Sequence, residues 1–351
     1  MREINQTIRN VQTMNNNKKW YGFNMIWLFS MGDRKEVAPS EIVINEKELD
    51  FIADMGCNFI RVPTDYRFWT HNFDYENRDE AMLKRLDACI DAVVSRGMHC
   101  SLNVHRAPGY CINGAELEKH NLWQDQIAQD AFVSLWKFLA ERYSSYGADQ
   151  LSFDLLNEPP NIGQYGMTRD IHEKLMRRTA AVIRSVTKDR QIILDGLCGG
   201  NEAMPELADL GAIHSTRGYQ PMSVTHYQAD WCPAAQTGKA PVYPGTEWEG
   251  KIWNRNTLLE HYAPWKALSD KGVSVHVGEF GCYDKTDHAT AMNWFNDLFS
   301  VYRELGWGFS LWNFIGEFGI IGHNRPGTIW ENIKGFKVDR ELYDLIKEYM
   351  K

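Results

Sequence analysis

Eight short apolar runs, separated by helical patterns, constrain the fold of this chain more than any other feature. The runs begin near Gly22, Asn58, His99, Leu151, Gln191, Ser223, Ser274 and Gly308, so that successive starts lie 32 to 52 residues apart. Apolar residues recur at helical spacing over 44–55, 81–96, 128–143, 170–186, 288–305 and 339–350. Apolar strands that alternate with helices are typical of a parallel sheet covered on both faces.

The count of eight predicts an α/β fold of the (β/α)8 TIM-barrel type. Although 351 residues could make two domains, no Gly/Ser-rich or Pro-rich linker divides the chain. We therefore expect a single barrel domain over 1–351, with 1–18 as an N-terminal extension. A doubly wound open sheet is the alternative, but neither GxGxxG nor a P-loop follows the first run.

Composition excludes several classes of partner. The net charge of −8 argues against nucleic acid and, more weakly, against an anionic membrane. No window approaches the roughly 20 apolar residues of a membrane span. The polar N-terminus lacks a signal peptide, and the seven cysteines are odd in number and show no CxxC spacing. We expect a cytoplasmic monomer, or a secreted protein if a leader has been removed.

Polar residues stand where six of the predicted strands end. In a (β/α)8 barrel, catalytic groups lie at the C-terminal ends of the strands, so side chains at these positions should meet. The strand ends carry Arg61, His105, Asn157-Glu158, His226-Tyr227, Glu279 and Trp312-Asn313.

Two of these residues are carboxylates that follow apolar runs. A lone ionised carboxylate in such a place is costly unless it is paired or used. Paired carboxylates suit glycoside hydrolysis, with about 5–5.5 Å between them for retention and about 6.5–9.5 Å for inversion. Sequence spacing does not decide between these outcomes. The simpler alternative is a buried salt bridge, for example between Glu279 and Arg61.

At this point the sequence resembles glycoside hydrolase family five, retaining (β/α)8-barrel enzymes that cleave β-linked glycans. The resemblance runs almost from end to end, and the segments HRAPGY and THYQADW look closest to bacterial endoglucanases. The segments that carry it, in family order, are GFN (22–24), GCNFIRVP (56–63), NVHRAPG (103–109), LNEPP (156–160), SVTHY (223–227), GEFG (278–281) and SLWN (310–313).

The resemblance implies roles for individual residues. Glu158 would be the acid/base and Glu279 the nucleophile. Arg61 would support Glu279 and keep it ionised, and Asn157 would hold the sugar 2-hydroxyl or the nucleophile.

Three further roles follow from the same resemblance. His105 would bind hydroxyls at the cleavage subsite, Trp312 would form the stacking floor beneath that sugar, and His226 would sit close to the acid/base. The family usually has His-x-Tyr after strand six, with the tyrosine touching the nucleophile. Here Tyr227 comes one place early, so either the backbone bulges or Gln228 or another group takes the contact.

Two long loops are predicted to form the walls of the cleft. The loop after the third run carries Trp123, and the loop after the sixth carries Trp231. Loops of this length are often functional, and tryptophan offers a flat surface for a sugar. We interpret both residues as sugar-stacking aromatics; the alternative is that each packs within its own loop.

The leading hypothesis is therefore a retaining endo-β-1,4-glucanase acting on a β-linked oligo- or polysaccharide. An endo-β-mannanase or glucomannanase on the same barrel is the close alternative. A non-catalytic carbohydrate-binding barrel and a metal-dependent barrel hydrolase are more distant ones. Because the histidines show no HExxH or other tight ligand spacing, we expect no metal and no cofactor.

Overall fold

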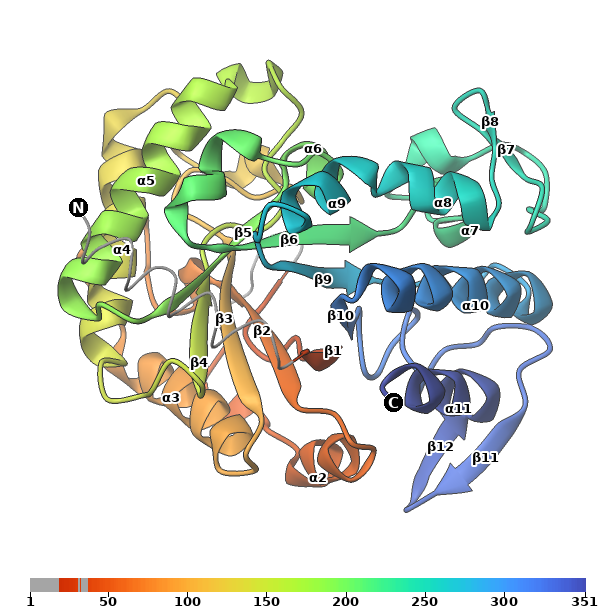
Figure 1. Ribbon diagram of the computed structural model, residues 1–351. Coiled ribbons are helices and arrows are strands. Elements are labelled where there is room, and N and C mark those ends of the chain that lie inside the picture. The colour runs from red at the N-terminus through yellow and green to blue at the C-terminus, as the bar shows by residue number, and fades with distance from the viewer. Residues whose placement is uncertain (1–18, 31, 33–36) are drawn as a thin grey trace.

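The computed structural model describes residues 19–30, 32 and 37–351, so the predicted extension over 1–18 lies outside the described residues. Eight parallel strands close into a barrel in the order β1-β10-β9-β6-β5-β4-β3-β2 (Figure 1). This confirms the predicted TIM barrel. The strands are β1 (Tyr21–Asn24), β2 (Phe59–Asp65), β3 (His99–Arg106), β4 (Leu151–Asp154), β5 (Gln191–Asp195), β6 (Ile213–Gly218), β9 (Val275–Phe280) and β10 (Gly308–Leu311).

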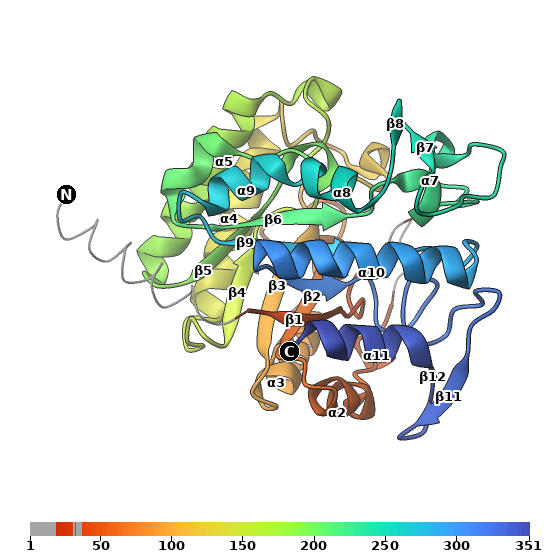
Figure 2. The ribbon, with the colours of Figure 1, turned by 45° about the vertical axis from the view of Figure 1, so that its right-hand side comes forward.

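Helices surround the barrel, and all six predicted helices form close to their expected positions. These six are α2 (Glu46–Asp54), α3 (Glu80–Val94), α4 (Gln126–Arg142), α5 (Arg169–Val186), α10 (His288–Leu305) and α11 (Arg340–Tyr349). Shorter helices lie in the connections: α6 (Leu197–Gly200), α7 (Met222–Thr225), α8 (Arg255–His261) and α9 (Ala263–Ser269). Helices α10 and α11 pack side by side (Figure 2).

Local sequence explains where the long helices begin and end. The side chain of Asp79 caps α3 by accepting hydrogen bonds from the backbone of Ala81 and Met82. Asp287 caps α10 in the same way, and Gly306 ends that helix at φ +75°. Carboxylate N-caps and a left-handed glycine after the last turn are standard start and stop signals.

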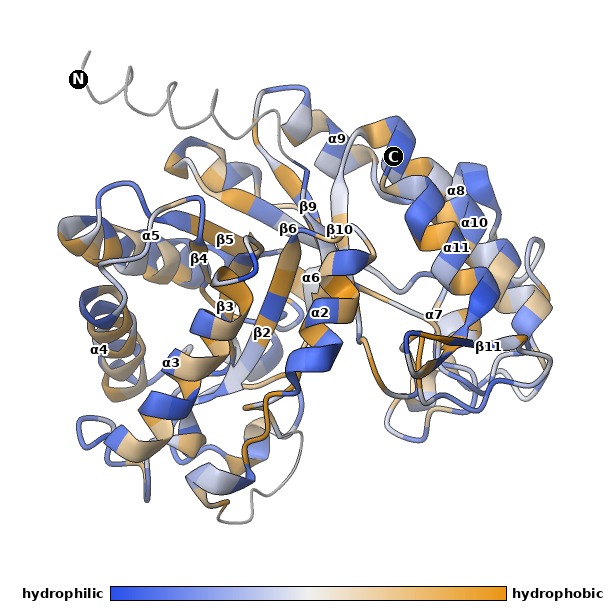
Figure 3. Ribbon diagram, turned by 90° about the horizontal axis from the view of Figure 1, so that it is seen from below, coloured by the Kyte–Doolittle hydropathy of each residue, from blue (hydrophilic) through white to orange (hydrophobic). Residues whose placement is uncertain are grey.

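The core lies in the barrel and between the barrel and its helices. Every residue of β2 and β3 is buried. Figure 3 shows hydrophobic residues gathered on the strands, whereas the helices alternate between hydrophilic and hydrophobic positions. The strands are therefore buried beneath the helices, and the helices keep their hydrophilic positions for the outer surface.

The predicted position of strand six was wrong. The strand is β6, Ile213–Gly218, ten residues before the expected start at Ser223. The segment SVTHY instead falls in α7 and the residues after it. Its β-branched residues suggest a strand, but Val224 and His226 donate backbone hydrogen bonds to Pro221 and Met222, which makes a helical turn.

Two small hairpins extend from the barrel. They pair β7 (Glu247–Trp248) with β8 (Lys251–Ile252), and β11 (Trp330–Ile333) with β12 (Phe336–Asp339). Among the helices that the structure describes, none combines the length and the apolar character of a membrane span.

Candidate active site

Glu158 and Glu279 line one cleft of about 660 Å³, together with His105, Trp231 and Trp312. Glu279 lies within β9, and Glu158 follows the end of β4 by four residues. The cleft is at the C-terminal ends of the strands, where this fold carries its catalytic groups.

Glu279 is held by three donors and is only 4% exposed. Nη1 of Arg61 donates a short hydrogen bond to Oε1. Nη2 of Arg217 lies 3.3 Å from the same oxygen, and the Tyr219 hydroxyl donates to Oε2 over 3.1 Å. A carboxylate with two guanidinium partners and a phenol partner is aimed and charged as a nucleophile requires.

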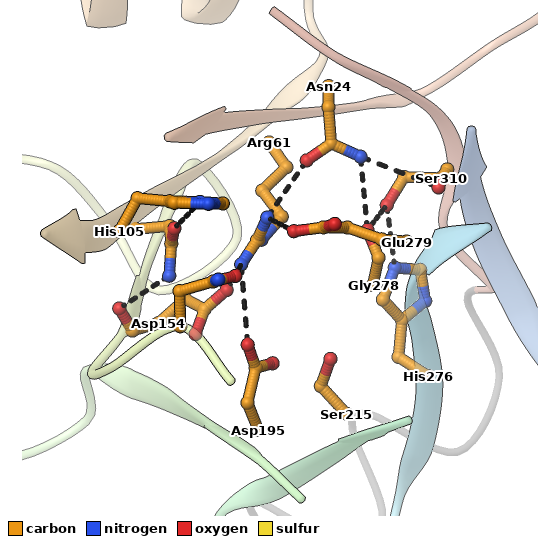
Figure 4. A network of polar contacts seen from close by, with 12 residues as sticks. Asn24, Arg61, His105, Asp154, Asp195, Ser215, His276, Gly278, Glu279 and Ser310 are labelled. Atoms are coloured by element: carbon orange, nitrogen blue, oxygen red, sulfur yellow. Dashed lines mark hydrogen bonds and ion pairs between the residues drawn. The ribbon is translucent and has the colours of Figure 1, made fainter. Parts of the chain in front are cut away.

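Arg61 is the buried centre of this network (Figure 4). Its Nε donates to Asp154 over 2.7 Å, Nη1 to Asn24 over 3.0 Å and Nη2 to Asn157 over 2.9 Å. Burial alone would lower the pKa of Arg61, but Asp154, Glu279 and other acids outweigh it and hold that pKa above its usual range. Arg61 is therefore a fixed cation beside Glu279.

Glu158 is positioned by both its backbone and its side chain. Its backbone has φ +44°, a left-handed conformation that costs energy in a residue other than glycine. Its N–H donates to Asp195 Oδ2 over 3.2 Å, and its carbonyl accepts from the Tyr110 hydroxyl over 2.7 Å. Its Oε1 accepts from Arg217 Nε over 2.7 Å.

The environment of Glu158 favours the protonated form. Burial and the negative charge of Glu279 raise the pKa of Glu158 to about 7, against the opposing effect of Arg217. A carboxyl group with a pKa near neutrality can give a proton and take one back at physiological pH.

Asn157 and His105 lie beside the two carboxylates. Oδ1 of Asn157 accepts hydrogen bonds from Arg61 and Arg217, each over 2.9 Å. Its buried Nδ2 has no partner among the described residues and remains free to donate. His105 Nδ1 lies 3.2 Å from Asn103 Oδ1. Burial, and then the charges of Arg61 and Arg217, hold the pKa of His105 well below its usual value, so its ring is neutral.

Trp312 and His226 line the cleft at different places. The half-buried ring of Trp312 stacks on His105, with centroids 5.4 Å apart. His226 packs against Tyr219 at 5.2 Å and Phe318 at 5.5 Å. His226 lines the same cleft as Glu158, and Arg217 donates a hydrogen bond to Glu158 directly.

The contact expected of Tyr227 is made by Tyr219. The Tyr227 hydroxyl instead accepts a hydrogen bond from the neighbouring Gln228. The reason is that β6 lies ten residues earlier in the sequence than predicted. Arg217, Gly218 and Tyr219 therefore stand at the end of this strand, where the family usually has His-x-Tyr. The tyrosine is thus at its regular spacing, and the histidine position holds arginine.

The two loop tryptophans differ in how far their side chains are exposed to the cleft. Trp231 is 50% exposed, lines the cleft and packs edge-on against Tyr283. Trp123 is only 1% exposed and packs against Tyr110 and His172. The structure therefore does not bring Trp123 to the cleft surface, because its ring is buried against Tyr110 and His172.

Five residues of the network were missed by sequence reasoning. Two sequence features could have indicated these residues. One is an acidic or amide residue at the ends of β1, β4 and β5, and the other is the Arg-x-Tyr spacing at the end of β6. The five residues are Asn24, Asp154, Asp195, Arg217 and Tyr219.

Within the part of the chain that the structure describes, no three His, Cys, Asp or Glu side chains are grouped as a metal site would need.

The family model for cellulase, glycosyl hydrolase family 5, matches residues 11–318. The chain belongs to this family. It is a glycoside hydrolase with a TIM barrel, and the family implies a β-linked carbohydrate substrate.

Individual relatives agree with this assignment. Endoglucanase C of Acetivibrio thermocellus is 27% identical over 77% of this chain and 84% of its own length. Cellodextrinase A of Ruminococcus flavefaciens is 23% identical over 75% of this chain and 76% of its own. A crystal structure described as a glycoside hydrolase is 52% identical, with a TM-score of 0.91 over 95% of this chain and 99% of that one.

Proposed function

We propose that this family 5 enzyme is a retaining endo-β-1,4-glucanase that hydrolyses β-glucans by double displacement. The observation that carries the proposal is the contrast between the two carboxyl groups of the cleft. Glu279 is surrounded by cationic and phenolic donors, whereas Glu158 has a pKa of about 7 and is available as an acid.

In the first step, Glu158 gives its proton to the glycosidic oxygen while Glu279 attacks the anomeric carbon. The C–O bond to the leaving sugar breaks, and a covalent glycosyl ester forms on Glu279. In the second step, Glu158 takes a proton from water, the water oxygen attacks the anomeric carbon, and Glu279 is released as a carboxylate.

The closeness of the two carboxyl groups supports retention over inversion. Oε1 of Glu158 and Oε1 of Glu279 both contact the guanidinium of Arg217, at 2.7 and 3.3 Å. Retaining enzymes need about 5–5.5 Å between the two groups, which one guanidinium can bridge, whereas inversion needs room for a water between them.

The stacking surfaces of the cleft support a polymeric β-glucan. Trp312 and Trp231 both line the cleft that holds the catalytic pair, and the ring of Trp231 is half-exposed. The similarity to Endoglucanase C favours a glucan over other glycans.

Reducing-sugar release from mixed-linkage β-glucan and from galactomannan, side by side with one enzyme preparation, tests the proposal. We expect β-glucan to be cleaved at least ten times faster. Faster release from galactomannan would overturn the substrate assignment in favour of a mannanase. A Glu279→Gln variant serves as the matched control, and full activity in it would favour a binding barrel with contaminating activity.

A further inference from the structure

Arg217 is a buried residue that contacts both carboxyl groups of the site, and the reaction described above does not yet use it. Its side chain has no exposed surface. Nε donates to Glu158 over 2.7 Å, and Nη2 reaches Glu279 over 3.3 Å. Arg217 is also the direct neighbour of Glu279 across the β6–β9 pairing, where the register shifts at Thr216/Arg217.

The barrel is shaped to hold this guanidinium in one orientation. Asp195 accepts from both Nη1 and Nη2, and Ser215 Oγ lies 3.1 Å from Nη1. Two glycines leave it space: a β-carbon on Gly200 would lie 2.3 Å from its Cγ, and one on Gly278 would lie 2.9 Å from its Nη1. The Arg217 guanidinium is therefore held in one orientation between the two carboxyl groups.

The chemistry of arginine at this position differs from that of histidine. A guanidinium stays charged at every pH of interest, and its several N–H groups can serve two acceptors at once. A histidine beside the acid/base would titrate in the same range as Glu158. Arginine gives the pair a cation whose charge does not change during the reaction.

Building on the function proposed above, we propose that Arg217 is a positioning residue shared by Glu158 and Glu279, and that its main ion pair passes from one to the other during each turnover. Before reaction, Glu279 carries the negative charge and Glu158 is protonated, so the ion pair of Arg217 is with Glu279, and its shorter contact to Glu158 is a hydrogen bond to a neutral carboxyl group. When Glu158 has given its proton to the leaving oxygen and Glu279 has become an ester, the charge lies on Glu158. Hydrolysis of the ester reverses this change.

The transfer needs no movement of the guanidinium, because Nε faces Glu158 and Nη2 faces Glu279. One carboxylate next to Arg217 is ionised at each stage, so the buried cation is never left with Asp195 as its sole charged partner. The ionised form of Glu158, which must act as a base in the second step, is stabilised by a charge-assisted hydrogen bond.

The double variant Arg217→Gln/Asp195→Asn tests this role. It removes the buried cation together with its main anionic partner, so that no unpaired charge remains in the barrel. We expect the alkaline limb of kcat/KM to move upward by up to about one pH unit, since Arg217 lowers the pKa of Glu158 by more than Asp195 raises it. We also expect kcat/KM at pH 6 to fall at least tenfold.

Two further variants separate positioning from folding. Arg217→Lys keeps the positive charge. Its alkaline limb should therefore be shifted less from that of the unmodified enzyme than the alkaline limb of the double variant is. Arg190 is another largely buried arginine, but it donates to the backbone carbonyls of Tyr143 and Leu151. Arg190→Gln should lower thermal stability and leave the alkaline limb in place.

A carbon-13 NMR titration of the Glu158 carboxyl group measures the pKa of Glu158 without a substrate. Its signal is assigned by its absence from the spectrum of the Glu158→Gln variant. A higher pKa of Glu158 in the folded double variant supports the proposal. An unchanged pKa and an unchanged alkaline limb in that variant would overturn it. If the unmodified enzyme cleaves no β-glucan, the proposed function fails, and the titration still decides whether Arg217 controls Glu158.

Discussion

The Tyr219 hydroxyl donates a hydrogen bond to Oε2 of Glu279 over 3.1 Å, and this contact fixes the carboxylate that we propose as the nucleophile. Tyr219 follows the end of β6 directly, whereas Glu279 lies inside β9, the next strand around the barrel. Burial and the negative charge of Glu279 hold the pKa of Tyr219 well above its usual value, so the phenol remains a donor throughout the working range of pH.

Replacing Tyr219 by phenylalanine should reduce kcat/KM by about 10- to 100-fold. The reason is the loss of a hydrogen bond to the charged carboxylate that we propose as the nucleophile, worth about 1.5–3 kcal/mol. Tyr227→Phe is the matched control. Because its hydroxyl contacts Gln228 rather than Glu279, it should change kcat/KM less than twofold. Equal losses in the two variants would contradict the assignment.

The pH dependence of activity should follow the protonation of Glu158. Glu158 must be protonated to release the leaving sugar, and its pKa is about 7. We therefore expect kcat/KM to fall as pH rises through about 7. A profile that stays level between pH 5 and 9 would be incompatible with this assignment.

Glu158 should also affect stability in a pH-dependent way. Its folded-state pKa of about 7 lies above the ordinary value of 4.5, so the folded chain binds more protons than the unfolded chain between these values. This contribution stabilises the folded state at low pH and is lost as pH rises through about 7. Relative to the unmodified chain, Glu158→Gln should therefore raise Tm more at pH 8 than at pH 4.5. A Tm difference that is constant with pH would contradict the raised pKa.

Trp231 should contribute to substrate binding rather than to chemistry. Its half-exposed ring lines the cleft, and aromatic stacking contributes about 0.5–1.5 kcal/mol. Trp231→Ala should raise KM for β-glucan by about 2- to 12-fold with kcat nearly unchanged. Trp123→Phe is the comparison: it alters a buried ring and should lower Tm without raising KM. A fall in kcat for Trp231→Ala at constant KM would argue against the stacking role.

The barrel itself could be predicted from sequence because seven of its eight strands are apolar runs at regular intervals. The sixth could not, since β6 has the sequence IHSTRG. Its inward positions hold Ser215 and Arg217, which serve the charge network, so hydrophobic patterning is lost there. The next segment, SVTHY, has the β-branched residues of a strand, but local hydrogen bonds make it helical.

The candidate site, like the barrel, could be predicted from the sequence only in part. Glu158 and Glu279 stand out because each is a charged residue where an apolar strand ends, and Arg61 because it is a charged residue within one; the structure brings the three together. Asp195 and Arg217 are also charged residues at strand ends. Their contacts with the two carboxyl groups depend on which strands are neighbours and on the orientation of one guanidinium group. Local sequence predicts neither.

Labelling with 2,4-dinitrophenyl 2-deoxy-2-fluoro-β-cellobioside, followed by peptide mass analysis, tests the central claim most directly. The fluorine slows both steps by opposing positive charge at the anomeric carbon, and the good leaving group restores the first, so the glycosyl ester accumulates. We predict one added 2-deoxy-2-fluorocellobiosyl group, on the peptide that contains Glu279, and none in Glu279→Gln. Attachment to Glu158, or release of the α-anomer from β-glucan without any labelling, would contradict it.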